Sequence, residues 1–234
     1  FYLNYRARRA GSDYRSVAED TANALVDLSK QKVAGVIVDL RNNPGGSLEE
    51  VAKMLGQVIK EGPVVQIRDG NGNVSIFEDT DGGEQLYSGP LAVMVNLASA
   101  SASEIYSAAI QDYGRGIVIG STTTGKGTAQ IQLDSLAYGQ ATLTQRKFYR
   151  VTGGSTQNKG VVPDIKLIDI YFEQFGERES KNPLEWDTIP TAAFKREGMV
   201  QPYIQTLQQA SDQRRATDPQ FKYLDTYVGL AKET

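Results

Sequence analysis

The chain of 234 residues contains no histidine and no cysteine, and these two absences exclude much of the chemistry that proteins use. Without histidine there is no imidazole ligand for a metal and no Ser-His-Asp triad. Without cysteine there is no thiol nucleophile and no thiolate metal site. We expect no metal and no cofactor in this chain. Without histidine and cysteine, a nucleophilic serine would need a carboxylate, tyrosine or lysine as its base.

Other features that are missing narrow the class of protein further. No apolar run approaches the roughly 18 residues that span a bilayer, so we expect no transmembrane helix. The net charge is −3 and basic residues are mixed with acidic ones, which argues against a nucleic-acid-binding surface. The start has neither an initiator methionine nor the apolar core of a signal peptide, so we expect a mature product or a fragment.

The first half of the chain alternates between strand and helix patterns. Apolar residues recur at helical spacing over 16–30, and the β-branched run at 33–40 is typical of a strand buried on both faces. The turn "RNNPGGS" then leads into a second helical pattern. Further along, two strands flank the turn signal "GNGN", and buried strands at 89–96 and 116–121 enclose a helix. This order predicts a mainly parallel sheet.

Beyond residue 121 the pattern changes. The segments "TAQIQL", "ATLTQRKFYRVT" and "DIKLIDI" come closer to alternating polar and apolar residues, which indicates antiparallel or edge strands. From residue 173 the sequence is charged, rich in glutamine and punctuated by prolines. We predict a core domain at 1–172 and a helical C-terminal extension at 173–234.

Candidate chemistry lies in the serine-rich stretch "NLASASASEIYSAAIQDYG" at 96–114, just before the predicted helix. A serine needs a neighbour that removes its proton, and a desolvated lysine serves this purpose in Ser-Lys hydrolases. Most lysines lie in helical patterns, turns or charged runs. Lys126 differs because it stands between two glycines, with no acidic residue within seven positions on either side.

The predicted elements suggest how these groups would meet. A strand that began at Lys126 would place Lys126, Thr128 and Gln130 on one side, where the glutamine could hold the amine. The first N–H groups of a helix point toward the place where an oxyanion would form. Gly45 and Gly46 could supply a second donor, since both loops follow the carboxyl ends of strands, where open α/β sheets bind ligands.

Each of these features also has a simpler interpretation. Ser103 is a good candidate for a helix cap, "NNPGGS" for a plain turn with a cap, and a lysine between glycines for a charge at a loop tip. From the residues alone, a Ser-Lys hydrolase is one alternative beside these.

Several motifs in a fixed order resemble the carboxyl-terminal processing proteases, and in particular their tail-specific group. The likeness covers nearly the whole chain and rests on "VIVDLRNNPGGSLEE", "SASASEIYSAAIQDYGRGIVIG", "TTTGKGTAQ", "RKFYRVTGGSTQNKGVVPDI" and "NPLEWDTIPTAAF". It implies an α/β fold, with a ClpP/crotonase-like spiral ββα protease core followed by the helical extension.

The resemblance also implies roles for particular residues. Ser101, the middle serine of the Ser-Ala run, corresponds to the nucleophile, Lys126 to its general base, and Gln130 to the residue that orients the lysine. The implied oxyanion hole consists of the N–H groups of Ala102 and Gly46, with Gly46 favoured over the glycine before it.

Asp112 corresponds to a third charge-relay residue of the family. It would, however, lie about 15 Å along the helix from Ser101 at 1.5 Å per residue. A structural role at the helix end, for example with Arg115, is an equal alternative.

The resemblance implies a serine endopeptidase of the bacterial periplasm, and peripheral association with the membrane is part of this expectation. Its substrates would be unfolded proteins or proteins with apolar C-termini, and an adaptor lipoprotein is a candidate partner. No PDZ domain is recognisable, so the chain corresponds to the part downstream of it. The alternatives are a non-catalytic binding module of the same fold, a fragment that is inactive without the PDZ domain, and a crotonase-like acyl-CoA enzyme. The joint presence of Ser101, Lys126 and Gln130 favours the protease.

Overall fold

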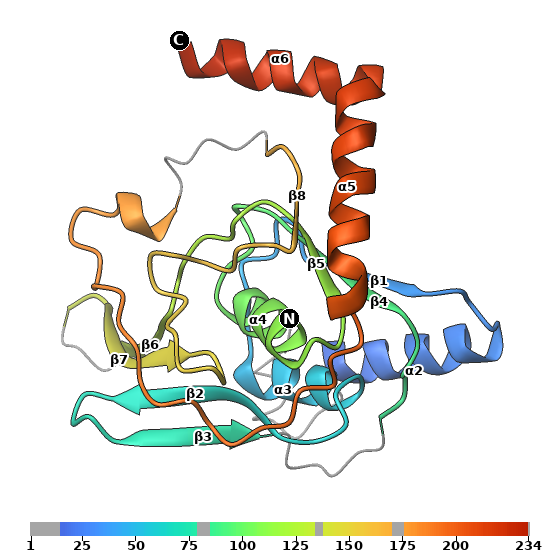
Figure 1. The fold of residues 1–234 in the computed structure, drawn as a ribbon. Coiled ribbons are helices and arrows are strands. Elements are labelled where there is room, and N and C mark those ends of the chain that lie inside the picture. The colour runs from blue at the N-terminus through green and yellow to red at the C-terminus, as the bar shows by residue number, and fades with distance from the viewer. Residues whose placement is uncertain (1–14, 79–84, 134–137, 170–175, 234) are drawn as a thin grey trace.

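Two four-stranded sheets organise the chain (Figure 1). The structure is a computed structural model that describes residues 15–78, 85–133, 138–169 and 176–233. The first sheet has the order β1-β4-β5-β8, with strands Val36–Asp39, Leu91–Val95, Ile117–Gly120 and Ile165–Lys166. The second has the order β3-β2-β7-β6, with strands Val74–Glu78, Pro63–Asp69, Ala141–Tyr149 and Thr128–Leu133.

The first sheet is parallel throughout, which confirms the prediction made from the alternating pattern. Its first strand differs from expectation, because β1 lies at the sheet edge and pairs with β4. As a result Ile37 is 67% exposed, and the prediction of a strand buried on both faces is wrong. An apolar run alone does not distinguish a central strand from an edge strand.

The second sheet is antiparallel. The hairpin of β2 and β3 turns at the predicted "GNGN", and β7 pairs with both β2 and β6. The strands predicted at 128–133 and 141–152 are therefore confirmed as antiparallel. The third, β8, is an edge strand that pairs in parallel with β5.

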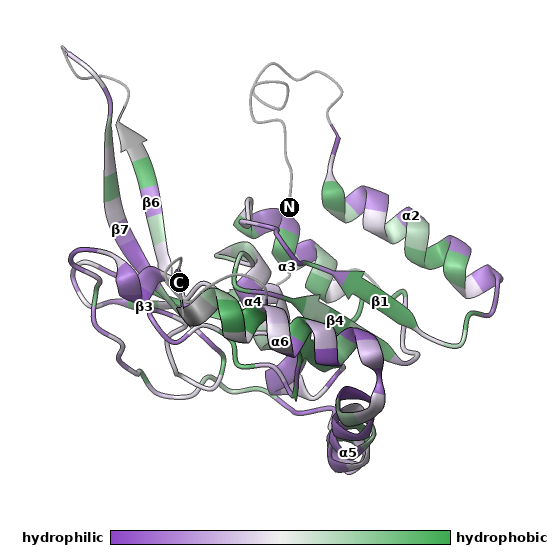
Figure 2. Ribbon diagram, turned by 90° about the horizontal axis from the view of Figure 1, so that it is seen from above, coloured by the Kyte–Doolittle hydropathy of each residue, from purple (hydrophilic) through white to green (hydrophobic). Residues whose placement is uncertain are grey.

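Three helices of the core follow from capped amphipathic sequences. They are α2, α3 and α4, at Val17–Lys30, Leu48–Gly56 and Ala102–Tyr113. The hydroxyls of Ser16 and Ser47 accept hydrogen bonds from the third residue of α2 and α3, as N-caps do. The apolar face of α3 packs on α4, with Val51 and Leu55 fully buried. Figure 2 shows apolar residues along β1 of the first sheet.

The C-terminal part contains a short 3-10 helix, η2 at Glu177–Glu179, and two longer helices, α5 at Gln201–Thr217 and α6 at Pro219–Glu233. The predicted helical extension is thus helical mainly from Gln201 onward. In Figure 1, α5 stands beside the first sheet and α6 turns away from the core. The predicted boundary at 172/173 lies outside the described residues and stays a prediction.

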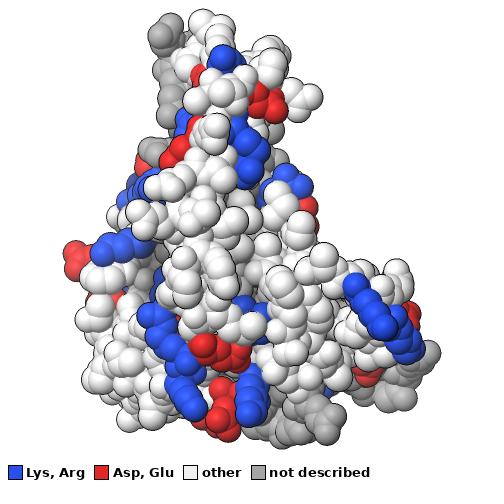
Figure 3. Space-filling model, turned by 45° about the vertical axis from the view of Figure 1, so that its right-hand side comes forward, with Lys and Arg blue, Asp and Glu red and all other residues white. Residues whose placement is uncertain are grey.

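Charged residues of both signs are interspersed on the face shown in Figure 3. No helix within the described ranges is long and apolar enough to cross a bilayer.

Candidate active site

The serine-rich stretch resolves into serines with different surroundings. Ser99, Ser103 and Ser107 are fully buried, and each hydroxyl donates to a main-chain carbonyl. Ser101 is only partly buried and stands at the N-cap of α4. The expectation that Ser103 caps the helix is therefore wrong, since α4 begins at Ala102 and the Ser103 hydroxyl bonds to Asn43 O at 2.9 Å.

The backbone of Ser101 has an unusual conformation, with φ 56° and ψ −114°. A non-glycine residue with positive φ is uncommon and costs energy, on the order of 1–3 kcal/mol, so its surroundings must enforce it. Ser101 N–H donates to the Glu104 carboxylate at 2.9 Å, and the glycine loop after β1 packs against its other side. Strained backbone conformations of this kind cluster at active sites, so the geometry makes Ser101 a candidate for a functional residue.

The glycine loop approaches Ser101 so closely that only a glycine fits at position 45. A Cβ on Gly45 would lie 2.8 Å from Ser101 Cβ and 2.8 Å from Ala102 N, and its φ of +100° also disfavours a side chain. Gly45 N–H donates to Asn43 Oδ1 at 3.0 Å. Within the described chain, the N–H groups of Gly46 and Ala102 have no hydrogen-bond acceptor. Both are the N–H groups for which we predict a role in binding an oxyanion, and that role stays a prediction, whereas Gly45 N–H is already engaged.

Glu104 is the central hydrogen-bond acceptor of the site. Its Oε2 accepts from the main-chain N–H groups of Ser101 and Lys126, each at 2.9 Å. Its Oε1 accepts from Thr123 Oγ1 at 2.6 Å and from Gly125 N at 2.7 Å. One fully buried carboxylate therefore joins the helix that carries the candidate nucleophile to the loop that carries the candidate base.

The charge state of this carboxyl group is finely balanced. Burial raises the pKa of Glu104 from 4.5 to about 7, although the hydrogen bonds from Thr123 and three main-chain N–H groups favour the ionised form. The group therefore titrates near neutral pH, where loss of its proton frees both oxygens to accept.

The loop around Lys126 is held at three consecutive N–H groups. Those of Gly125 and Lys126 donate to Glu104, and that of Gly127 donates to Oε1 of the fully buried Gln157 at 2.9 Å. No hydrogen bond joins the Lys126 amine to the Ser101 hydroxyl, and no described carboxylate lies within 4.0 Å of that amine. The main chain of Lys126 is thus held in place by Glu104.

The hydrogen bond described for the Gln130 side chain goes to Thr144 and not to Lys126. The register between β6 and β7 shifts between Ala129 and Gln130, which breaks the alternation that would place Gln130 beside the lysine. The Gln130 side chain is exposed, and its Nε2 lies 3.4 Å from Thr144 Oγ1. The role of Gln130 in orienting the lysine stays a prediction.

Asp112 lies in the last turn of α4 and is engaged away from Ser101. Its carboxylate accepts two hydrogen bonds from the Arg150 guanidinium, at 2.5 and 3.0 Å, and one from Thr152 Oγ1 at 3.3 Å. These contacts fit the structural alternative, although the partner is Arg150 rather than Arg115.

Arg115 instead donates to three carbonyl oxygens, those of Val58, Tyr87 and Gly89.

A cavity of about 410 Å³ opens at the carboxyl ends of the parallel strands. It is lined by residues that follow β1 and β4, among them Asn42 and Asn96, whose side chains bond to each other at 2.9 Å. This is the edge at which the strand pattern predicted a ligand. No group of three or more acidic side chains suited to a metal ion occurs in the part of the chain that the structure describes.

Two residues of the site were not predicted from the sequence. Glu104 stands three positions after the N-cap Ser101, a spacing typical of a capping box, so the signal was present but indicated only a helix start. Gln157 lies 30 residues beyond Gly127, and no local pattern connects the two.

The structure thus combines an α/β fold with a strained serine at the start of a helix, beside glycine-rich loops. A family model for peptidase family S41 matches residues 7–167, and a model described as the C-terminal domain of tail specific protease matches residues 170–234. The chain belongs to peptidase family S41, and its predicted kinship with the tail-specific proteases is confirmed.

Individual relatives agree with this assignment. The chain is 43% identical to the tail-specific protease of Haemophilus influenzae, over 95% of this chain and 34% of that protein. It is 34% identical to the carboxy-terminal processing protease CtpB of Bacillus subtilis, over 73% of this chain and 35% of that protein. The chain thus spans about a third of the length of these curated relatives.

Solved structures share the fold. The photosystem II D1 C-terminal processing protease matches with a TM-score of 0.57 and 34% identity, over 64% of this chain and 38% of that one. Mature CPAF complexed with lactacystin matches with a TM-score of 0.56 over 86% of this chain and 48% of that one, and its 16% identity shows the fold alone. The predicted α/β protease fold is confirmed.

Proposed function

We propose that this chain forms the catalytic core of a serine endopeptidase in which Ser101 is the nucleophile and Lys126 is the general base. The observation that carries the proposal is the shared acceptor: one oxygen of Glu104 binds the main-chain N–H of both residues. Their main chains are therefore adjacent, although 25 positions separate them in the sequence.

In the proposed reaction, Ser101 Oγ attacks the carbonyl carbon of a peptide while the neutral Lys126 amine takes the hydroxyl proton. The tetrahedral oxyanion accepts hydrogen bonds from Gly46 and Ala102 N–H. Lys126 then protonates the leaving amine, and water hydrolyses the acyl-enzyme by the same route. The lysine side chain would have to turn toward Ser101, as apo enzymes often require before their catalytic hydrogen bonds form.

We also propose that the substrates are unfolded proteins or proteins with apolar C-termini in the bacterial periplasm. The support is kinship with proteases named for tail-specific and carboxy-terminal processing. The cavity lined by Asn42 and Asn96 lies at the same edge of the parallel sheet, but neither Ser101 nor Lys126 lines it, so it does not identify where the peptide binds. Peripheral membrane association and an adaptor lipoprotein belong to the same proposal.

The test is hydrolysis of unfolded casein by the purified chain. Ser101→Ala and Lys126→Ala should each abolish cleavage while the circular dichroism spectrum and melting temperature stay those of the wild type. Ser107→Ala, on the same helix, and Lys30→Ala, an exposed lysine, are matched controls that should remain active. Cleavage that persists in either site variant would refute the dyad, whereas binding of casein without any cleavage would favour the non-catalytic module.

A further inference from the structure

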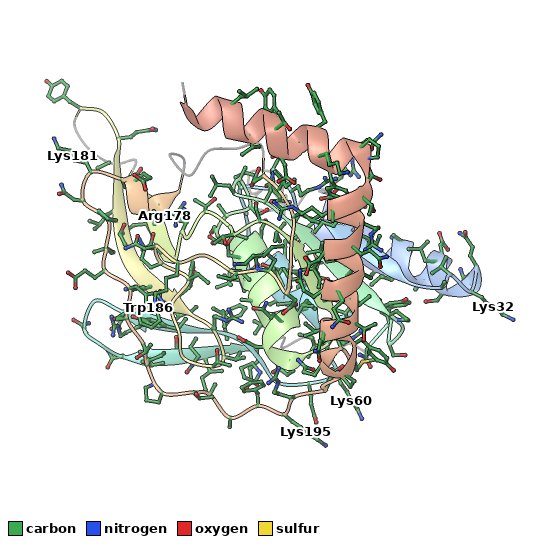
Figure 4. The ribbon with its side chains drawn as sticks, turned by 45° about the horizontal axis from the view of Figure 1, so that its top comes forward. Lys32, Lys60, Arg178, Lys181, Trp186 and Lys195 are labelled. Carbon is green, nitrogen blue, oxygen red and sulfur yellow. The ribbon has the colours of Figure 1, made fainter. Side chains whose placement is uncertain are left out.

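A segment of the C-terminal region reaches the loop that carries the candidate base. Glu177, the first residue of η2, donates its main-chain N–H to Thr124 O at 2.9 Å. Its carboxylate Oε1 accepts from Gln157 Nε2 at 3.3 Å. Figures 1 and 4 show this short helix, labelled at the neighbouring Arg178 in Figure 4, beside β6 and β7. The residues matched by the C-terminal family model thus touch the protease core at the site.

Gln157 is the link between Glu177 and the loop. It is fully buried, its Oε1 accepts from Gly127 N at 2.9 Å, and its Nε2 faces Glu177. The next residue, Asn158, donates its main-chain N–H to Gly125 O at 2.8 Å. The segment at 157–158 therefore forms hydrogen bonds with the glycines on both sides of Lys126.

The main chain of the segment at 157–158 packs tightly against that of the loop at 125–127. A Cβ on Gly127 would lie 2.6 Å from Gln157 N, and one on Gly125 would lie 2.9 Å from the carbonyl carbon of Asn158. The loop cannot shift toward this segment, and Glu104 holds its N–H groups from the other side. The direction in which Lys126 leaves the backbone is consequently set by these contacts.

We propose that Glu177 is a positioning residue for the general base, acting through Gln157; the proposal rests on the proposed function of Lys126. An amide side chain can present either its oxygen or its nitrogen to a neighbour. With the amide reversed, the nitrogen of Gln157 would face Gly127 N–H and its oxygen would face the Glu177 carboxylate, so both contacts would be repulsive. Asn158 Oδ1 also accepts from Gln157 Nε2 at 3.3 Å, so the charged carboxylate of Glu177 and this neutral amide oxygen together select the orientation in which Gln157 accepts from Gly127.

This arrangement gives the C-terminal region a direct influence on catalysis. The charge lies on η2, the amide lies on the segment after β7, and the lysine lies on the loop before β6. Displacement of η2 would release the Gln157 amide and loosen the main chain next to Lys126. The expected effect falls on the rate of the chemical step rather than on substrate binding.

The experiment exchanges the two side chains in the full 234-residue chain. Gln157→Glu places two carboxylates face to face, and we expect kcat on unfolded casein to fall about tenfold with KM unchanged. The double variant Gln157→Glu with Glu177→Gln restores a donor opposite an acceptor while Glu at 157 still accepts from Gly127. Its kcat should return to within about threefold of the wild type.

Glu177→Ala should lower kcat to a similar extent as Gln157→Glu and should move the acidic limb of the pH–rate profile, because the base is held less well. The matched control is Glu179→Ala, on the same turn, whose carboxylate is exposed and pairs with Arg178 at 3.8 Å. This control should leave kcat, KM and the pH profile unchanged.

Amide hydrogen exchange of residues 125–127 provides a readout that does not depend on activity. Exchange should quicken in Gln157→Glu and return to the wild-type rate in the exchanged pair. Unchanged exchange and kcat in Gln157→Glu, or a double variant no better than the single one, would overturn the proposal. If the wild type cleaves nothing, the proposed function fails, and exchange alone then decides whether Glu177 positions this loop.

Discussion

Glu104 and Lys126 are joined by a hydrogen bond of 2.9 Å from the lysine N–H to the buried carboxylate. Because the same oxygen accepts Ser101 N–H, the glutamate sets the spacing between the two candidate reacting residues. Its carboxylate also accepts hydrogen bonds from four donors, counting those of Thr123 and Gly125, and the glutamate itself is fully buried. An unsatisfied buried donor costs about 1–3 kcal/mol, so this one side chain matters to both the fold and the site.

Replacing Glu104 by glutamine should therefore lower kcat strongly. An amide has a single acceptor oxygen, and in either orientation its NH₂ group would face at least one main-chain N–H group that now donates to the carboxylate. If 2–3 kcal/mol of positioning is lost, the decrease is roughly 30- to 150-fold. Casein hydrolysis by the folded variant measures the effect. Glu19→Gln is the matched control, since Glu19 holds the equivalent third position of α2 but is exposed. Full activity of a folded Glu104→Gln protein would contradict this prediction.

The stability of the protein should depend on pH through the same carboxyl group. Burial raises the pKa of Glu104 from 4.5 to about 7, so the folded chain binds more protons than the unfolded chain between these values. The free energy of unfolding should then fall as the pH rises from about 4.5 to about 7, by about 3 kcal/mol. The hydrogen bond from Arg41 lowers the pKa of Asp39 below 3.8, and its contribution changes only at more acidic pH.

Urea denaturation at several pH values between 4.5 and 7.5 provides the measurement. The difference in unfolding free energy between the wild type and Glu104→Gln should change across this range, because glutamine cannot titrate. A difference that is constant with pH would show that Glu104 does not titrate in this window.

Much of the fold could be predicted from the sequence because its elements have local causes. The parallel strands β1 and β5 are β-branched runs, and α2 and α3 begin at serines that cap them. The exposure of Ile37 could not be predicted, since it depends on which strand forms the sheet edge. The register shift at Gln130 depends on how β6 pairs with β7, and the local sequence pattern does not indicate it.

The candidate site was predictable to a similar degree. The absence of histidine directed attention to Lys126, and the resemblance of the motifs singled out Ser101 among its neighbours. Glu104 and Gln157 were not predicted, because a buried carboxylate and a buried amide are recognised only once the segments they join are adjacent. Their contacts are long-range in sequence and determined by packing.

Gly45→Ala should abolish activity and destabilise the protein. The new methyl group would lie 2.7 Å from Ala100 O and 2.8 Å from Ser101 Cβ, which forces the glycine loop away from the serine. The positive φ of +100° adds strain of about 1 kcal/mol or more. Gly72→Ala separates the effect of the steric clash from that of the backbone strain. Gly72 also has a positive φ, +87°, but nothing lies within 4 Å of its Cβ position.

The control Gly72→Ala should thus be slightly less stable in a thermal melt and fully active on casein. If Gly45→Ala were as active as this control, the close approach of the glycine loop to Ser101 would not be required for function.

Asp112→Ala should reduce stability more than activity. Its carboxylate is buried and accepts two hydrogen bonds from Arg150 and one from Thr152, and these tie the end of α4 to the end of β7. Loss of a partly buried ion pair of this kind costs about 2–3 kcal/mol, which should lower the melting temperature by several degrees.

At a temperature where the Asp112→Ala variant is folded, kcat on casein should stay within about threefold of the wild type, because the carboxylate lies about 15 Å along the helix from Ser101. Asp112→Asn should be destabilised less, since its amide oxygen can still accept from Arg150 while the charge is lost. If Asp112 were instead a third charge-relay residue, the opposite result would be expected. Both variants would then fold with a normal melting temperature, and their kcat would fall a hundredfold or more. Melting curves and kcat measured on the same preparations therefore decide between the two roles of Asp112.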